Sequence, residues 1–255
     1  MGDDDSLFDR ARRAVAGPTP AERAAELDDR ADDDPSALDD DDVEDLIDLL
    51  DADDPEAVTD ALHALGSLVR ARPGSVEPAV PAVFAGLSER PASEWTSTTL
   101  GDASQSFMHD LSRGEILLHV ARSNPAALDP VVDDLADRFA AGTLEPRTIF
   151  ALAYAVAAAP DRVDVDPSSL AGLVAENLRQ AVESAVVSDD DGWMDLGLPL
   201  QPMPTRGYID LLDRFDDDAL DADVVADARD ALETASRLSD DEETVAAAEE
   251  ALPDG

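Results

Sequence analysis

Histidine is the residue type in this chain best suited to acid–base or metal chemistry near neutral pH, because the sequence has no cysteine. His63 and His119 fall inside stretches with helical spacing, and His109 precedes Asp110 near an expected helix start. The residues that follow the three histidines are Ala64, Asp110 and Val120, so none of the histidines belongs to a His-Glu pair that could bind iron. We therefore expect packing or surface roles for them, and we expect neither a metal nor a cofactor.

Short runs of aspartate are the second candidate for chemistry, because carboxylates bind Ca²⁺. A helix-loop-helix calcium site needs alternating oxygen ligands, a glycine at the sixth place and a bidentate glutamate at the twelfth. If Gly192 is taken as the sixth place, Val187 stands at the first place and Leu198 at the twelfth. Neither side chain has an oxygen ligand, so the motif is absent. We expect these runs to be solvated surface. They are Asp39–Asp42, Asp189–Asp191 and Asp216–Asp218.

Motifs for catalysis do not occur in the sequence. There is no glycine-rich phosphate loop, no Gly-x-Ser-x-Gly elbow and no zinc-binding helix motif. We therefore expect a noncatalytic protein. The alternative is an enzyme or enzyme-associated subunit with its site between the segments 91–106 and 188–208.

Arginines in the less acidic middle of the chain are the candidates for binding an anion. Arg70 and Arg122 stand 52 positions apart at matching places of an internal repeat, so they would recur on one edge of stacked repeats. Pairing with neighbouring carboxylates is the competing expectation. Nucleic-acid binding is not expected, because it needs a basic groove to neutralise phosphates.

Both tryptophans lie outside the regular apolar pattern, where aromatic and methionine side chains can anchor a partner. Trp95 lies in a Ser- and Thr-rich stretch, and Trp193 lies in a proline-rich stretch with Met194, Met203 and Tyr208 nearby. These five residues, together with Arg70 and Arg122, are the predicted contacts to another protein. The alternative is that the proline-rich stretch folds back and its tryptophan packs on the end of the helices.

Helix starts and apolar spacing predict an all-helical chain. Thr19–Glu22 and Ser239–Glu242 read as capping boxes, and Asp54 with Pro55 repeats the arrangement of a cap followed by proline. Apolar residues then recur at helical spacing in two consecutive runs. No window shows the sustained alternation expected of strands. The runs are Val58, Leu62, Leu65, Val69 and then Val76, Val80, Val83, Leu87.

An internal repeat is the most informative pattern. The segment 70–78 aligns with 122–130, and both contain a proline after a helix, followed three residues later by an apolar residue and then an acid. Weaker copies begin at Pro35 and Pro160. Proline disfavours helical backbone in its predecessor, so each copy predicts a helix end, a turn and a new helix. The long spacing between Pro73 and Pro125 requires an insertion, which segment 88–106 supplies.

Residues 54–87 resemble one HEAT repeat, with Asp54–Leu68 similar to its first helix and Val76–Leu87 to its second. The resemblance covers about residues 38–180 and is diffuse outside this repeat. It implies a stack of antiparallel helix pairs that serves as a scaffold for protein binding. Thr59 stands where many HEAT repeats have arginine. The iron site of HEAT-repeat hydroxylases, made of adjacent His-Glu pairs, is missing.

The charge is extreme: 60 acidic residues face 18 basic ones, all of them arginine, for a formal net charge of −42. Residues 1–60 carry −18, residues 61–187 carry −7 and residues 188–255 carry −17. Salt at 1 M shortens the Debye length to about 3 Å and screens such repulsion. The absence of lysine and the richness in alanine and valine resemble the proteins of halophilic archaea.

The predicted protein is all-α: an α-solenoid of antiparallel, HEAT-like helix pairs with short acidic flanking helices. Its predicted segments are acidic helices in 1–37, repeats with the insertion in 38–187, and a proline-rich loop with acidic helices in 188–255. No apolar run is long enough to cross a membrane, and the amino terminus is acidic rather than basic, so we expect a cytoplasmic location. The predicted partner is another protein, and the oligomeric state stays open.

Overall fold

The computed structural model describes residues 18–97, 103–187 and 202–252, and these segments are all helical with no strand among them. They divide into two compact units, Met1–Gly86 and Leu87–Gly255. The division between the units falls next to the predicted insertion 88–106. The division of the chain into segments 1–37, 38–187 and 188–255 stays a prediction. Within the described ranges, no helix is both long and apolar enough to cross a membrane.

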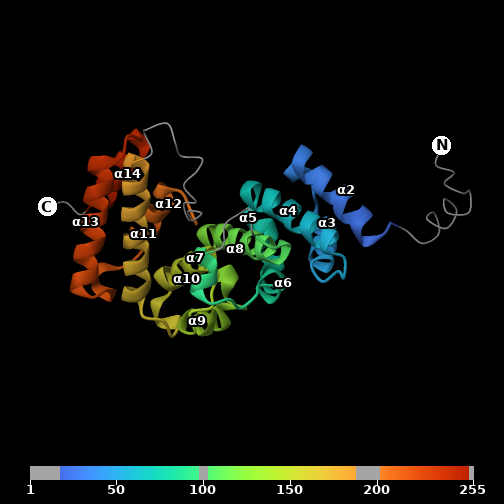
Figure 1. Cartoon of the computed structure of the whole chain (residues 1–255), viewed down its shortest axis with the longest axis horizontal. Coiled ribbons are helices and arrows are strands. Elements are labelled where there is room, and N and C mark those ends of the chain that lie inside the picture. The colour runs from blue at the N-terminus through green and yellow to red at the C-terminus, as the bar shows by residue number, and fades with distance from the viewer. Residues whose placement is uncertain (1–17, 98–102, 188–201, 253–255) are drawn as a thin grey trace, which may run out of the picture. The chain divides into compact units, whose positions relative to one another are not determined.

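The first unit is built around α4, which packs against α2 and α3 (Figure 1). The buried apolar faces of these helices form its core. Its elements are α2 (Pro20–Asp33), the 3₁₀ turn η1 (Pro35–Ala37), α3 (Asp40–Leu49), α4 (Pro55–Ala71), α5 (Pro73–Val76), η2 (Glu77–Ala79) and α6 (Val80–Ala85).

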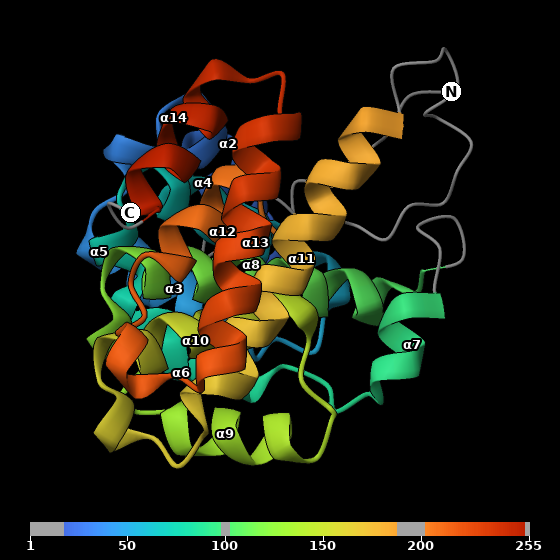
Figure 2. The same cartoon turned by 90° about the vertical axis from the view of Figure 1, so that its left-hand side faces the viewer.

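The second unit pairs α8 with α10 and α11 with α13, and α11 and α13 lie side by side in both views (Figures 1 and 2). The helix α10 also contacts α9, α11 and α12, which places it near the middle of the unit. Its elements are α7 (Ala92–Ser97), α8 (Gln105–Ser123), η3 (Pro125–Leu128), α9 (Val132–Ala140), α10 (Pro146–Ala158), η4 (Pro160–Arg162), α11 (Pro167–Val187), α12 (Thr205–Leu212), η5 (Asp217–Ala219), α13 (Ala222–Leu238) and α14 (Glu242–Ala251).

The four predicted proline turns share one backbone geometry. In each, the residue before proline is extended at φ between −144° and −158° and donates its N–H to the carbonyl four residues earlier. The amide two residues after proline then donates to the carbonyl of the residue before it, at 2.9 to 3.1 Å. The apolar residue three positions after proline is buried every time. These residues are Leu38, Val76, Leu128 and Val163.

The predicted apolar faces are confirmed, but the predicted helix Val76–Leu87 is wrong. All eight apolar residues of the two predicted runs are buried. After Val76, however, the chain forms η2 and then the short helix α6 rather than one continuous helix. Pro78 and Pro81 lack the N–H that a continuous helix would need there, so the helical turns tighten and break.

Two of the predicted caps form as expected and one does not. Thr19 and Glu22 make a reciprocal capping box, and Asp54 accepts the amide of Glu56. The box predicted to start at Ser239 is wrong, because Ser239 ends α13 and donates its N–H to Ala235. The cap of α14 is Asp241, whose carboxylate accepts the amide of Thr244 at 3.1 Å.

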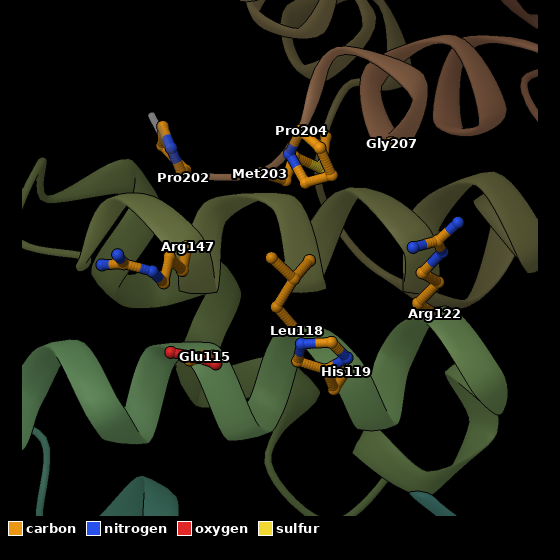
Figure 3. A pocket seen from close by; sticks show the side chains of 9 residues that line it. All are labelled: Glu115, Leu118, His119, Arg122, Arg147, Pro202, Met203, Pro204 and Gly207. Atoms are coloured by element: carbon orange, nitrogen blue, oxygen red, sulfur yellow. The ribbon is translucent and has the colours of Figure 1, made fainter. Parts of the chain in front are cut away.

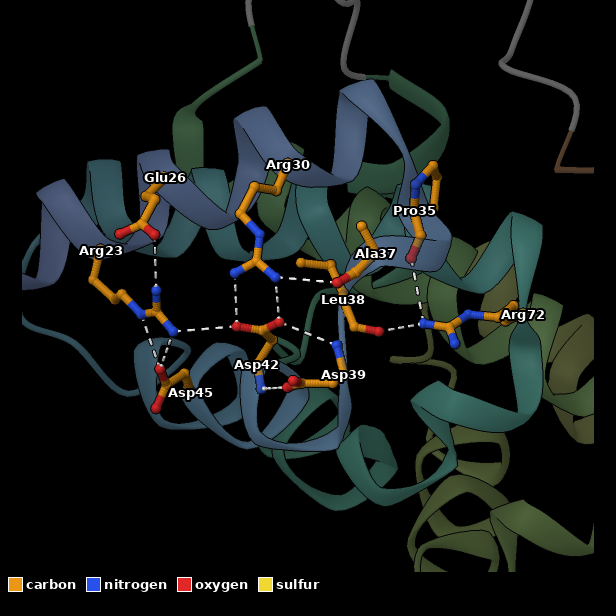
Figure 4. A network of polar contacts seen from close by, with 10 residues as sticks. All are labelled: Arg23, Glu26, Arg30, Pro35, Ala37, Leu38, Asp39, Asp42, Asp45 and Arg72. Carbon is orange, nitrogen blue, oxygen red and sulfur yellow. Dashed lines mark hydrogen bonds and ion pairs between the residues drawn. The ribbon is translucent and has the colours of Figure 1, made fainter.

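One residue of the run Asp39–Asp42 is a buried hub, contrary to the expectation of solvated surface. Asp42 is 5% exposed and accepts two hydrogen bonds from the Arg30 guanidinium, at 2.9 and 2.7 Å, and one from Arg23 at 3.2 Å (Figure 4). Burial alone would raise the pKa of Asp42, but these arginines and the amide of Asp39 hold it below its usual value. The run therefore joins α3 to α2.

Candidate binding groove

A groove of about 370 Å³ opens between α8, the start of α10 and the segment that leads into α12. Leu118 lies at its centre, with Arg147 toward one end and Arg122 toward the other, and Pro202–Pro204 passes above (Figure 3). We call this site the α8–α10 groove. Its lining residues are Glu115, Leu118, His119, Arg122, Arg147, Pro202, Met203, Pro204 and Gly207.

The floor of the groove is one face of α8. Glu115, Leu118, His119 and Arg122 follow the spacing i, i+3, i+4, i+7, which places them in one stripe along a helix. Within this stripe Arg122 is exposed, Glu115 and His119 are half-buried, and Leu118 is buried at the centre. The sequence carries this signal, as polar residues at helical spacing inside an otherwise apolar stretch.

Arg147 is positioned by a buried carboxylate at the start of α10. Glu145 caps α10 by accepting the amide of Thr148 at 2.9 Å and its hydroxyl at 3.1 Å, while Arg147 donates to the other carboxylate oxygen at 3.4 Å. The side chain of Glu145 lies against Gly114 of α8, where any Cβ would sit 2.0 Å from its oxygen. Burial raises the pKa of Glu145 to about 7, although Arg147 and Thr148 act in the opposite direction.

Arg122 belongs to a polar network that ties α8, α10 and α12 together. Its guanidinium lies 3.6 Å from the carboxylate of Asp210, and Arg214 lies at the same distance from that carboxylate. The hydroxyl of the buried Tyr154 donates to Asp210 at 3.1 Å. Burial, together with the charge of Asp210, raises the pKa of Tyr154. The side chain of Arg122 is still 47% exposed, so it can also reach a ligand.

The roof of the groove rests on α12 through close packing. Met203 is buried, and its side chain lies where a Cβ on Gly207 would come within 3.1 Å of its sulfur. Tyr208 packs edge-on against Phe150 of α10, with ring centroids 5.3 Å apart, and burial raises its pKa to about 12. The glycine and the aromatic pair thus fix the height of the roof above α8.

The groove offers an apolar centre between two cationic ends. Leu118 and Met203 supply the apolar surface, and Arg147 and Arg122 can each donate two hydrogen bonds to a carboxylate or phosphate. His119 adds a donor or acceptor, and Glu115 adds an acceptor. This arrangement suits a ligand that combines negative groups with an apolar part, in a protein whose surface is otherwise strongly acidic.

The predicted contact residues fall in different places. Met203 and Arg122 line the groove, and Tyr208 supports its roof. Arg70 lies in the first unit, beside a hollow that also includes Asp32. Like Arg122, it is the next-to-last residue of its helix, so the repeat places both arginines alike. The predicted contacts Trp193 and Met194 lie outside the described residues.

Trp95 packs inside the second unit. It is 8% exposed, and its ring lies 5.0 Å from that of Phe107, with Leu111 completing the cluster. The Arg90 guanidinium stands 5.8 Å from both ring centroids. This cluster anchors the predicted insertion, now seen to contain α7, to the start of α8. Its role as a partner contact stays a prediction.

The titratable side chains His109, Asp110 and Glu115 of α8 lie in different surroundings. Asp110 is buried and accepts hydrogen bonds from the amide of Ser88 at 2.9 Å and from Arg90 at 3.1 Å. Glu115 instead lines the α8–α10 groove with His119. His109 precedes Asp110 in the chain. Burial lowers the pKa of His109, and the charge of Arg113 acts in the same direction.

Comparison of the chain with known protein families, with curated protein sequences and with solved structures found no match. The resemblance to HEAT repeats therefore stays a hypothesis that rests on the residues 54–87 and on the proline turns.

Proposed function

We propose that this chain is a noncatalytic scaffold for protein–protein interaction, with the α8–α10 groove as its binding site. The observation that supports this most is the apolar centre of the groove, flanked by Arg122 and Arg147, within a protein of net charge −42. Arginine and buried apolar anchors are typical of binding hot spots. In this proposal the scaffold is an α-solenoid of antiparallel, HEAT-like pairs in the salty cytoplasm of a halophile.

Support for stacked repeats comes from the recurrence of one turn at four places. Each proline turn ends one helix, buries one apolar residue and starts the next segment. Helices two steps apart along the chain then pack together, as α2 does with α4 and α8 with α10. Such units offer extended surfaces rather than deep chemical pockets, which suits a binding scaffold.

The occupant we propose is an extended segment of a partner protein in which acidic side chains flank an apolar one. The apolar side chain would lie between Leu118 and Met203, and the carboxylates would meet the two arginines. At high salt the arginines act only over contact distances, because screening removes longer-range attraction. Affinity would then depend on the apolar surface buried at the centre of the groove. The two arginines would fix the position of the partner segment along the groove.

The test is partner capture at multimolar KCl with a photoreactive amino acid at His119, followed by identification of the cross-linked segment. We expect one stoichiometric protein whose cross-linked segment is acidic and apolar. The double variant Arg122→Glu, Arg147→Glu should lose it. Arg229→Ala should keep it, because this exposed arginine lies on α13, away from the groove. Recovering no stoichiometric partner, or equal capture by the double variant, would refute the proposal.

A second candidate is an enzyme or enzyme-associated subunit that uses the same groove. Glu115 and His119 stand one helical turn apart and face the same cavity, as an acid–base pair would. This alternative predicts that a small anionic molecule raises the melting temperature, and that Glu115→Gln abolishes its turnover while the molecule still binds. Stoichiometric capture of a protein segment without any small-molecule effect would favour the scaffold.

A further inference from the structure

A mixed cluster of nitrogen and oxygen ligands lies in the first unit, far in sequence from the groove residues. Asp28 and Asp32 stand one turn apart on α2, and His63 faces them from α4. The Nδ1 atom of His63 is 2.7 Å from an oxygen of Asp28 and 3.9 Å from one of Asp32. One potential ligand atom from each of the three residues lies within 4.8 Å of the others.

The two carboxylates have no arginine partner within the described part of the chain. The arginines of α2 are used elsewhere, since Arg23 and Arg30 both reach Asp42 of α3. His63 is the only basic side chain that pairs with Asp28 or Asp32 among the described residues. A cation at this point would relieve the repulsion between two carboxylates that share one face of a helix.

We propose that Asp28, Asp32 and His63 form a site for a divalent transition metal, with Zn²⁺ as its probe ion. Zn²⁺ bonds to imidazole nitrogen at about 2.0 Å and to carboxylate oxygen at about 2.1 Å, so tetrahedral ligands stand about 3.3 Å apart. The 2.7 Å and 3.9 Å separations at His63 lie on either side of that value. Small side-chain rotations would therefore seat all three ligands, with the half-exposed imidazole exchanging its contact with Asp28 for the ion.

The imidazole decides which ion the site favours. Carboxylates alone suit Mg²⁺ and Ca²⁺, whereas imidazole nitrogen suits zinc and other late first-row metals. Three protein ligands leave a fourth position for water, and the exposure of the cluster lets the ion exchange with solvent. Asp60, one turn before His63 on α4, adds another carboxylate close enough to interact with Asp28 and His63. Arg70 borders Asp32 from the hollow beside it.

The test is titration of the tag-free full chain with Zn²⁺ in multimolar KCl, where screening suppresses loose association with the acidic surface. We expect one tight Zn²⁺ per chain and no comparable Mg²⁺ binding. His63→Ala and Asp28→Asn should each weaken binding about tenfold or more. His109→Ala and Asp33→Asn are the matched controls and should bind as the wild type does. Melting curves of each variant show that the fold is kept.

A site-specific readout separates this site from adventitious binding. The chain has three histidines, so nitrogen-15 spectra of the imidazoles can follow each ring during the titration. We expect the Nδ1 signal of His63 to shift at one equivalent, with His109 and His119 unchanged. Several weak ions per chain, equal binding by His63→Ala, or an unmoved His63 signal would overturn the proposal. The result is independent of the groove, which lies in the other unit.

Discussion

Gly114 allows the carboxylate of Glu145 to approach α8 more closely than any other residue would. A Cβ at this position would lie 2.0 Å from one carboxylate oxygen and 2.6 Å from the carboxyl carbon. Because Glu145 caps α10 and holds Arg147, this contact sets one end of the groove. The glycine is therefore required by packing rather than by backbone conformation.

We expect Gly114→Ala to destabilise the second unit. Forcing a methyl group against a buried carboxylate should lower the free energy of unfolding by about 1 to 3 kcal/mol, with the better helix propensity of alanine already included. Gly172→Ala is the control, since nothing lies within 4 Å of its added Cβ in α11, and it should stabilise by up to about 1 kcal/mol. Denaturant unfolding of both variants measures the difference. Equal stabilities would show that Glu145 moves aside without cost.

Glu145 should also give the fold a specific pH dependence. Its pKa rises from 4.5 to about 7 in the folded chain, so the folded state binds more protons than the unfolded state between these values. Its contribution to stability is therefore present below about pH 4.5 and is lost as the pH rises through 7. The variant Glu145→Gln removes this dependence. The free energy of unfolding of the variant minus that of the wild type should therefore increase between pH 5 and pH 8, by about 3 kcal/mol at most.

The measurement is the free energy of unfolding at several pH values for Glu145→Gln and the wild type. Glu176→Gln serves as the control, because it removes one exposed carboxylate of the same unit. A difference between Glu145→Gln and the wild type that stays constant with pH would contradict the expectation. It would mean that the ionised carboxylate is accommodated by Arg147 and Thr148.

At the scale of elements, the proline turns are the units that repeat. Each has an extended residue before proline, a hydrogen bond that closes the turn and one buried apolar side chain. The prolines stop the preceding helices, and the buried side chain fixes the angle at which the next segment leaves. The same construction occurs once after α2, α4, α8 and α10.

Leu128 should be the most sensitive residue of its turn. It is fully buried, so Leu128→Ala leaves a cavity between η3 and its neighbours and should cost about 2 to 5 kcal/mol. Leu173→Ala provides the comparison, because that leucine is 39% exposed on α11 and its truncation should cost well under about 1 kcal/mol. Unfolding in denaturant at high salt tests both. A similar loss of unfolding free energy in the two variants would show that the buried side chain of the turn does not stabilise the fold.

At the scale of the whole molecule, the distribution of charge predicts how the protein responds to salt. Residues 1–60 and 188–255 carry most of the net charge, and the middle carries little. Lowering KCl well below 1 M lengthens the Debye length, so repulsion should loosen the acidic flanks before the centre. Hydrogen exchange at several salt concentrations measures the order of opening. Faster exchange in residues 61–187 than in the flanks at low salt would contradict this.

The buried hub at Asp42 modifies this expectation for α2 and α3. Its hydrogen bonds with Arg23 and Arg30 are contact interactions of a buried carboxylate, which salt screens less than exposed pairs. Loosening of the first flank should therefore begin outside this hub. Exposed acidic positions such as Asp40 and Asp41 carry the repulsion.

Several features were predictable because they depend on local chemistry. The box at Thr19, the cap at Asp54 and the four proline turns all formed where the residue types required them. The apolar spacing identified the buried faces correctly. Errors arose where two local signals competed, as at Ser239, which ends one helix instead of starting the next, and at Pro78, which breaks a predicted helix.

The candidate sites were predictable only in part. Met203 was chosen by residue type and Arg122 by its place in the internal repeat, and both line the groove. The cluster at His63 was missed, because its carboxylate partners are more than 30 residues away and come near only when α2 packs on α4. Local patterns contain no information on such pairs.

The sequence by itself determined the helical class of the described chain, the positions of its turns and the faces that it buries, because propensity, capping and proline act over a few residues. Tertiary structure decided which charges meet. It buried Asp42 beneath two arginines, pressed Glu145 against Gly114 and placed His63 beside two aspartates. These contacts depend on how helices distant in sequence pack, and the chemistry proposed for both units follows from that packing.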